Sequence, residues 1–122
     1  MTLKELYDAI GGDYDQALKV LRVEKLADKH IRKLPDNAIF GAIAAAGEAM
    51  DAAQLFESSH AIKGVCGNLG LTRMAALASE ISEEFRPGNA RTLTDDQVKD
   101  KLREIDEAFQ NAAAHIREYA AQ

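Results

Sequence analysis

The longest regular pattern in this sequence of 122 residues lies near its C-terminus. Thr94 and Gln97 have the spacing of a capping box, in which two side chains satisfy free amides at the start of a helix. Apolar residues then recur at alternating steps of four and three, at Val98, Leu102, Ile105, Phe109, Ala112 and Ile116. The pattern predicts a helix of about 26 residues, or roughly 39 Å at 1.5 Å per residue. Because a sustained 4-3 stripe packs at a shallow angle against long neighbours, we expect an antiparallel bundle.

The composition also indicates an all-α fold. Alanine is abundant, runs of valine, isoleucine and threonine are absent, and only two prolines and eight glycines are available for turns. The length suits one domain with one core, so we assign residues 1–122 to a single domain. We expect an antiparallel four-helix bundle with additional short helices at the N-terminus.

Start and stop signals define the first helices. We expect a short helix over residues 2–10 that ends at Gly11 and Gly12. A second segment is capped by Asp13 and leads through further apolar positions to a stop at Pro35.

The remaining helices have similar signals. Asp36 is expected to cap a helix that ends near Gly47, and Asp51 a helix that ends at Gly70. Another helix follows directly and ends at a loop formed by residues 87–89. Residues with helical apolar spacing are expected to face the core in these segments: Leu3, Leu6, Tyr7, Ile10, Ala17, Leu18, Leu21, Val23, Leu26, Ala27, Ile31, Leu34, Met74, Ala78, Ile81 and Phe85.

Charge and cysteine content exclude several classes of function. The formal net charge of −5 argues against a nucleic-acid partner, because phosphate backbones require a basic face. A single cysteine cannot form an internal disulfide framework. No apolar stretch reaches about 18 residues, and the first residues lack a signal-peptide core. We therefore expect a cytoplasmic protein with no membrane partner.

The segment around His60 places a histidine on the polar side of a helix. With residues set 100° apart, the opposite side holds Leu55, Ser58, Ile62, Val65, Cys66 and Leu69. The near side, within about 60° of the histidine, holds Phe56, Lys63, Gly64, Gly67 and Leu71. We therefore expect His60 to face solvent beside a lysine and two glycines.

This combination has a chemical interpretation. A glycine inside a helix costs roughly 1 kcal/mol relative to alanine, and Gly64 and Gly67 accept that cost twice on one face. Without Cβ atoms they would let another protein approach the imidazole, although they could instead permit close packing between helices inside the protein. An exposed imidazole is largely neutral and nucleophilic at neutral pH, and the Lys63 ammonium can donate to a phosphoryl group on the ring. These features predict a histidine that accepts and passes on a phosphoryl group.

The residues His60-Ala61-Ile62-Lys63-Gly64, followed by Asn68-Leu69-Gly70-Leu71, resemble the signature of histidine-containing phosphotransfer (HPt) domains. That signature is H-x-[LI]-K-G, followed by small residues and then L-G-hydrophobic. The local match continues through Ile81. Val65 and Cys66 depart from it, since many members carry serine or alanine there, but both positions are expected to face the core.

The resemblance implies a carrier in a multi-step phosphorelay. His60 would take a phosphoryl group on Nε2 from an aspartyl phosphate of a response-regulator receiver domain, often fused to a hybrid sensor histidine kinase. It would then pass the group to a second receiver, while Lys63 offsets negative charge. The Mg²⁺ would be held by the receiver, so the chain would need no cofactor or metal of its own. It would be a phosphocarrier without an ATP site rather than an enzyme, and we expect a monomer.

A docking surface for the partner is expected around the histidine, at Phe56, Gly64, Gly67, Asn68 and Leu71. Phe56 has two interpretations, because it could also lie at the edge of the core. The same alternatives apply to an apolar group in the preceding helix, formed by Ile39, Phe40 and Ile43.

Other functions remain open at this point. The bundle could be an interaction module that binds and inhibits a receiver or histidine kinase without using His60. It could also be a structural bundle, which would leave the two glycines unexplained, or a kinase fragment phosphorylated in trans.

The remaining polar groups are expected to be structural. His30 and His115 lack the glycine and lysine neighbours of His60, and neither has a partner at metal-ligand spacing. Glu80, Glu83 and Glu84 are interpreted as a solvated acidic face.

Overall fold

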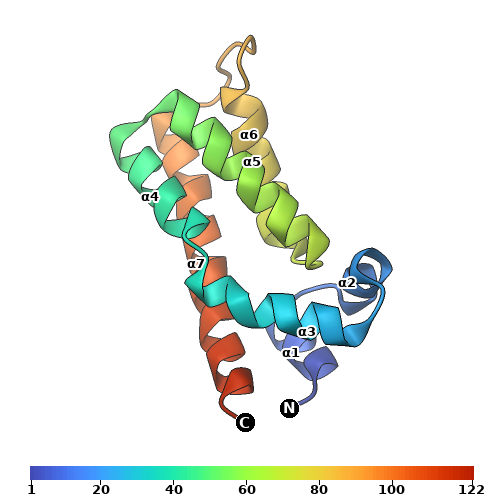
Figure 1. The fold of residues 1–122 in the computed structure, drawn as a ribbon. Helices are drawn as coiled ribbons and strands as arrows, with labels where there is room; N and C mark the ends of the chain where they lie inside the picture. The colour runs from blue at the N-terminus through green and yellow to red at the C-terminus, as the bar shows by residue number, and fades with distance from the viewer.

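The computed structural model describes residues 1–122 and contains helices but no strands (Figure 1). In chain order the elements are α1 Leu3–Ile10, α2 Tyr14–Leu21, α3 Glu24–Lys33, the 3-10 turn η1 Leu34–Asp36, α4 Ile39–Ala49, α5 Ala52–Asn68, α6 Thr72–Phe85 and α7 Asp95–Ala120. The predicted all-α fold class is confirmed. No helix combines the length and the apolar character that crossing a membrane would require.

Helices α4 to α7 form the bundle, and α1 to α3 lie at one end of it (Figure 1). Helix α5 packs most extensively against α6 and also contacts α4, while α7 contacts α1, α3, α4 and α6. The buried core contains 26 residues drawn from all seven α-helices. Phe40 stacks on Phe109 with ring centroids 4.0 Å apart, and Ile43 is also buried. The apolar group of α4 is therefore mainly core, with Ile39 half-buried at its edge.

Most predicted helix starts are confirmed by their hydrogen bonds. The Thr94 side chain accepts from the Gln97 amide, and the Gln97 side chain accepts from the Thr94 amide. Asp13 accepts from the Gln16 amide at the start of α2, and Asp51 accepts from the amide three residues later at the start of α5.

The predicted cap at Asp36 is wrong. Leu34, Pro35 and Asp36 form the 3-10 turn, so α4 starts later, at Ile39. Its first amide instead donates to the Asn37 side chain at 3.1 Å. Aspartate is a common N-cap residue, but Asp36 is the last residue of the 3-10 turn and lies three residues before α4 begins.

The apolar stripe predicted from residue 23 onward is also partly wrong. Arg22 has φ 76 and ends α2, so α3 begins with a new helical phase. Val23 and Leu26 are exposed, whereas Ala27 and Ile31 are fully buried. The break rotates the earlier part of the stripe away from the core.

The end of α5 is fixed by a Schellman motif and by the N-terminal helices. Gly70 has φ 71, the Leu71 amide donates to the Cys66 carbonyl, and the Gly70 amide donates to the Gly67 carbonyl. The Asp13 amide donates to the Gly70 carbonyl at 2.7 Å. A Cβ at Gly70 would lie 2.2 Å from the Asp13 carbonyl oxygen, so only glycine fits this joint.

A second tether crosses the same joint. The buried Tyr7 hydroxyl in α1 donates to the Leu69 carbonyl at 2.7 Å. This bond satisfies a carbonyl near the end of α5 that the helix itself leaves free. Helices α1 and α2 therefore hold the C-terminal end of the histidine-bearing helix in place.

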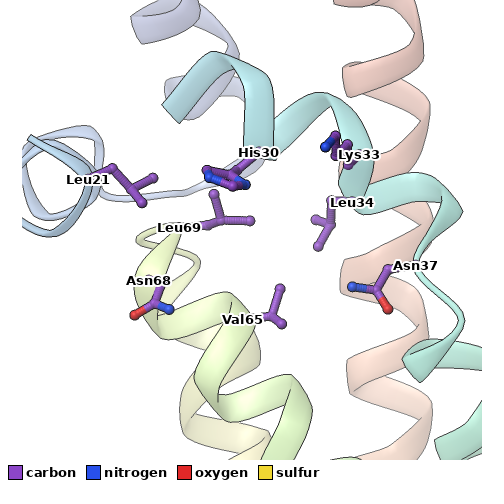
Figure 2. A pocket seen from close by; sticks show the side chains of 8 residues that line it. All are labelled: Leu21, His30, Lys33, Leu34, Asn37, Val65, Asn68 and Leu69. Atoms are coloured by element: carbon purple, nitrogen blue, oxygen red, sulfur yellow. The ribbon is translucent and has the colours of Figure 1, made fainter. Parts of the chain in front are cut away.

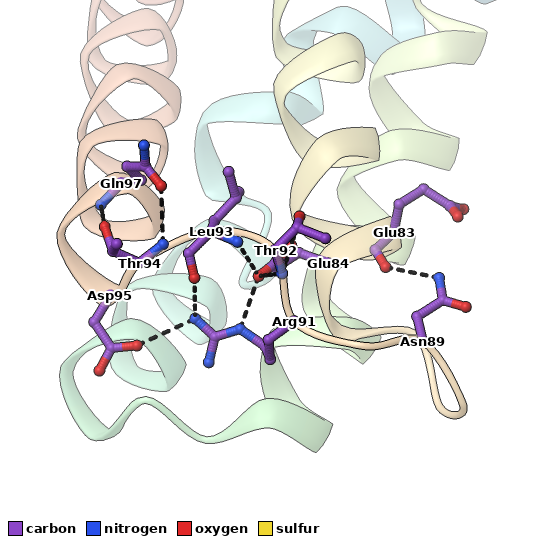
Figure 3. A network of polar contacts seen from close by, with 9 residues as sticks. All are labelled: Glu83, Glu84, Asn89, Arg91, Thr92, Leu93, Thr94, Asp95 and Gln97. Atoms are coloured by element: carbon purple, nitrogen blue, oxygen red, sulfur yellow. Dashed lines mark hydrogen bonds and ion pairs between the residues drawn. The ribbon is translucent and has the colours of Figure 1, made fainter.

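The loop between α6 and α7 is held by Glu84, which is buried (Figure 3). Its carboxylate accepts from Arg91 Nε at 2.8 Å, from the Thr92 hydroxyl at 2.8 Å, and from the amides of Thr92 and Leu93. Burial alone would raise the pKa of Glu84, but these hydrogen bonds outweigh it and lower the pKa to about 2. The interpretation of Glu84 as part of a solvated face is therefore wrong, although Glu80 and Glu83 are exposed.

Candidate functional site

His60 lies in the middle of α5 with its side chain exposed. On the opposite side of the same helix, Leu55, Ile62 and Cys66 are fully buried in the core. Burial raises the pKa of the Cys66 thiol to about 12, which makes it unreactive. The predicted division of this helix into a buried side and a solvent-facing histidine is confirmed.

The two glycines beside His60 open onto empty space. A Cβ added at Gly64 or at Gly67 would meet no other atom within 4 Å. By contrast, a Cβ at Gly47 in α4 would lie 2.6 Å from the Leu102 side chain. Close packing inside the protein therefore does not explain Gly64 and Gly67, and the surface beside them is open.

An aromatic ring flanks the imidazole on its N-terminal side. The Phe56 ring stacks on the His60 ring with centroids 5.8 Å apart and an interplanar angle of 23°. Phe56 is half-buried and packs against the core, so it is both an edge-of-core residue and a neighbour of the histidine.

Positive charge comes from two helices. Lys63 is exposed one turn after His60 on α5. The Arg86 guanidinium, at the C-terminal end of α6, lies 5.5 Å from the Phe56 ring centroid, a cation–π distance. Arg86 also binds Glu83, with Nη2 2.7 Å and Nε 3.1 Å from Glu83 Oε1.

Arg86 is the residue of this site that sequence reasoning missed. No local pattern marks it, because it reaches the site across the α5–α6 interface from the end of another helix. The only sequence signal is its spacing of three residues from Glu83, which is common on helix surfaces.

The predicted docking residues divide into two groups. Phe56, Gly64, Gly67 and Asn68 lie on α5 and are at least partly accessible. Leu71 is buried, so its predicted place on this surface is wrong. The helical projection assumed that α5 continues to residue 71, but the helix ends at Asn68 and the Schellman turn directs Leu71 into the core.

A hollow of about 260 Å³ lies at the C-terminal end of α5 (Figure 2). Val65, Asn68 and Leu69 come from the end of α5 and face residues of the N-terminal helices and η1 across it. The other lining residues are Leu21, His30, Lys33, Leu34 and Asn37. His30 is thus an exposed residue that lines this hollow together with Asn68.

The third histidine differs from the other two. His115 is half-buried on α7, and its Nδ1 lies 2.9 Å from the Asn111 carbonyl oxygen. The structure contains no group of three or more histidine, cysteine, aspartate or glutamate side chains that could hold a metal ion. Of the three histidines, only His60 combines exposure with open glycines and nearby cations.

Comparison with known proteins gives one result. A family model described as the Hpt domain matches residues 22–118, which include α3 to α6 and all but the last two residues of α7, with His60 inside the match. No curated protein and no solved structure gives a significant match. The chain therefore belongs to the Hpt domain family, whose members act as phosphocarriers in histidine phosphotransfer and interact with receiver domains in phosphorelays.

Proposed function

We propose that this chain relays a phosphoryl group between receiver-domain aspartates through His60. The observation that carries the proposal is the placement of an exposed imidazole beside two glycines whose missing Cβ atoms leave open space. A reactive group on another protein can therefore approach the ring without a steric barrier from positions 64 and 67. Catalysis of phosphoryl transfer depends mainly on such positioning and on charge stabilisation.

The proposed step exchanges one bond for another at phosphorus. Nε2 of neutral His60 attacks the phosphorus of an aspartyl phosphate in line with the leaving oxygen. The phosphorus–nitrogen bond forms as the phosphorus–oxygen bond breaks, and the bonding electrons leave with the aspartate carboxylate. Lys63 offsets negative charge on the transferring group. The reverse sequence delivers the group to a second receiver.

We propose that the partners are receiver domains, including one attached to a hybrid sensor histidine kinase. The receiver supplies the Mg²⁺, and this chain works as a monomeric carrier in the cytoplasm without an ATP site. Phe56, Gly64, Gly67 and Asn68 form the docking surface around the histidine. Residues 1–122 act as one domain, since a single core cluster extends from Leu3 to Ile116.

The test is phosphotransfer from a phosphorylated receiver in the presence of Mg²⁺. The wild-type chain is expected to take an acid-labile, base-stable label, and the His60→Gln variant none. His115→Gln is the matched control, because it removes an imidazole on α7 outside the site and should keep the label. If wild type and His60→Gln bind the receiver equally and neither takes label, the chain is an interaction module rather than a carrier.

A further inference from the structure

Glu83 and Arg86 form an ion pair beside the phosphoacceptor site that no step of the proposed relay uses. The Arg86 guanidinium lies against the Phe56 ring at 5.5 Å, and that ring stacks on His60 at 5.8 Å. The guanidinium and the imidazole therefore border the same phenyl ring. An arginine side chain has enough rotatable bonds to move its guanidinium toward a group attached to the imidazole.

The pair is exposed and held by few contacts. The Glu83 and Arg86 side chains are 56% and 41% exposed, and the 2.7 Å contact joins residues three apart at the end of α6. Hydrogen bonds from Arg86 and its positive charge lower the pKa of Glu83, and the charge of Lys63 lowers it further. The Glu83 carboxylate thus has one ion-pair partner, Arg86, and Lys63 acts on it only through longer-range charge. Exposed ion pairs of this kind are weak and exchange partners readily.

A phosphoryl group on His60 would compete with Glu83 for Arg86. It adds close to two negative charges and three acceptor oxygens, and arginine binds such oxygens in a bidentate fork. A phosphoryl group therefore offers Arg86 a better partner than the single carboxylate oxygen that it contacts in this structure.

We propose that Arg86 moves from Glu83 to the phosphoryl oxygens when His60 is phosphorylated, so that Glu83 competes with the phosphoryl group for this arginine. Arg86 then binds the phosphoryl group together with Lys63, and Glu83 sets how tightly it does so by holding Arg86 in the unmodified state. This inference rests on the proposed function, because it requires a phosphoryl group on His60. It adds a second cation and a competing carboxylate to the site.

The experiment measures the pKa of the phosphoryl group on His60 by ³¹P NMR. Phosphoramidate loads the intact chain without a receiver: its phosphorus–nitrogen bond breaks and ammonia leaves as the bond to the imidazole forms. A cation that binds the phosphoryl group favours the dianion and lowers its pKa. We expect Arg86→Gln to raise this pKa and Glu83→Gln to lower it, each by about 0.2 to 0.7 units. Arg86→Lys should retain part of the wild-type effect.

The double variant Glu83→Gln/Arg86→Gln distinguishes an effect of Glu83 through Arg86 from a direct effect of the Glu83 charge on the phosphoryl group. If Glu83 acts through Arg86, Glu83→Gln should have no effect in the Arg86→Gln background. An equal effect in both backgrounds would overturn the inference, since Glu83 would then act only as a distant charge. Matched controls are Glu80→Gln, which removes a partner of Lys101, and Arg73→Gln, which removes a partner of Glu104. Neither control should shift the pKa.

The same experiment distinguishes this inference from the proposed function. If phosphoramidate labels His60 and the variants share one phosphoryl pKa, the inference fails and the relay stands. If wild type takes no label from phosphoramidate or from a receiver, the proposed function fails and the inference fails with it. Circular dichroism identifies a variant that does not fold, and Arg86→Lys still tests the inference if Arg86→Gln is such a variant.

Discussion

Glu83 and Glu84 are adjacent near the end of α6, yet they belong to two different kinds of region. The Glu84 side chain is 3% exposed and accepts hydrogen bonds from Arg91, Thr92 and Leu93 of the loop. The Glu83 side chain is 56% exposed, and its carboxylate pairs with Arg86 alone. A fully satisfied carboxylate fixes a backbone, whereas one with a single exposed partner is free to exchange it. The bundle thus combines a rigid frame with an open, exchangeable surface around His60.

The largest expected effect comes from breaking the buried carboxylate. Glu84→Gln replaces one acceptor oxygen by an amide donor that faces other donors, which should lower the free energy of unfolding by about 3 to 4 kcal/mol. Glu83→Gln, one residue earlier, should leave the free energy of unfolding nearly unchanged, because the side chain is exposed. Urea denaturation followed by circular dichroism measures both. Equal losses in the two variants would contradict the distinction between the regions.

Acid should have an effect similar to that of the Glu84 substitution. The folded pKa of Glu84 is about 2, below the ordinary value of 4.5, so its stabilisation is present above pH 4.5 and is lost as pH falls toward 2. Thermal unfolding between pH 6 and 2 should therefore show a steeper loss of stability in wild type than in Glu84→Gln. Parallel profiles for the two proteins would show that this carboxylate is not the group that titrates.

Replacement by alanine should have opposite effects on stability at Gly70, in the joint, and at Gly64, beside His60. Gly70→Ala combines a positive φ with a close approach to the Asp13 carbonyl and should destabilise the fold by about 2 to 3 kcal/mol. Gly64→Ala should instead stabilise α5 by about 0.5 to 1 kcal/mol and slow transfer from a receiver about tenfold, because the methyl group occupies the docking clearance. Gly41, in α4, also has no atom within 4 Å of an added Cβ. Gly41→Ala is therefore the control that should add stability without slowing transfer.

At Lys63 we expect an effect on the transfer rate with little effect on stability. Lys63→Gln should reduce the rate of phosphotransfer about tenfold through lost charge stabilisation. It should leave the unfolding free energy within about 0.5 kcal/mol of wild type, since the side chain is exposed. Lys99→Gln, which removes an exposed lysine from α7, is the control for net charge and should transfer at the wild-type rate. A loss of stability in Lys63→Gln would indicate a structural role instead.

Periodic and local signals were sufficient to predict the bundle and the solvent-exposed face of α5 that carries His60. The 4-3 stripe of α7, its capping box at Thr94 and Gln97, and the glycine end of α5 at Gly70 all depend on residues within one helix or one turn. His60 could be assigned to the exposed side for the same reason.

The features that sequence reasoning missed depend on contacts between segments. Glu84 is buried because a loop seven to nine residues later brings its donors back onto α6. Leu71 turns inward because α5 ends three residues before it, and Arg86 reaches the site from a neighbouring helix. No periodicity within one helix encodes such distant contacts.

The joint between Tyr7 and Leu69 has a consequence for the order of folding. The hydrogen bond joins residues 62 positions apart in the chain. Helices α1 and α2 are therefore synthesised well before Leu69 and Gly70, whose carbonyls they bind. Helices of eight residues are marginal in isolation, and closing so long a loop carries an entropic cost. Helices α1 and α2 are therefore expected to dock late, once the turn after α5 has emerged.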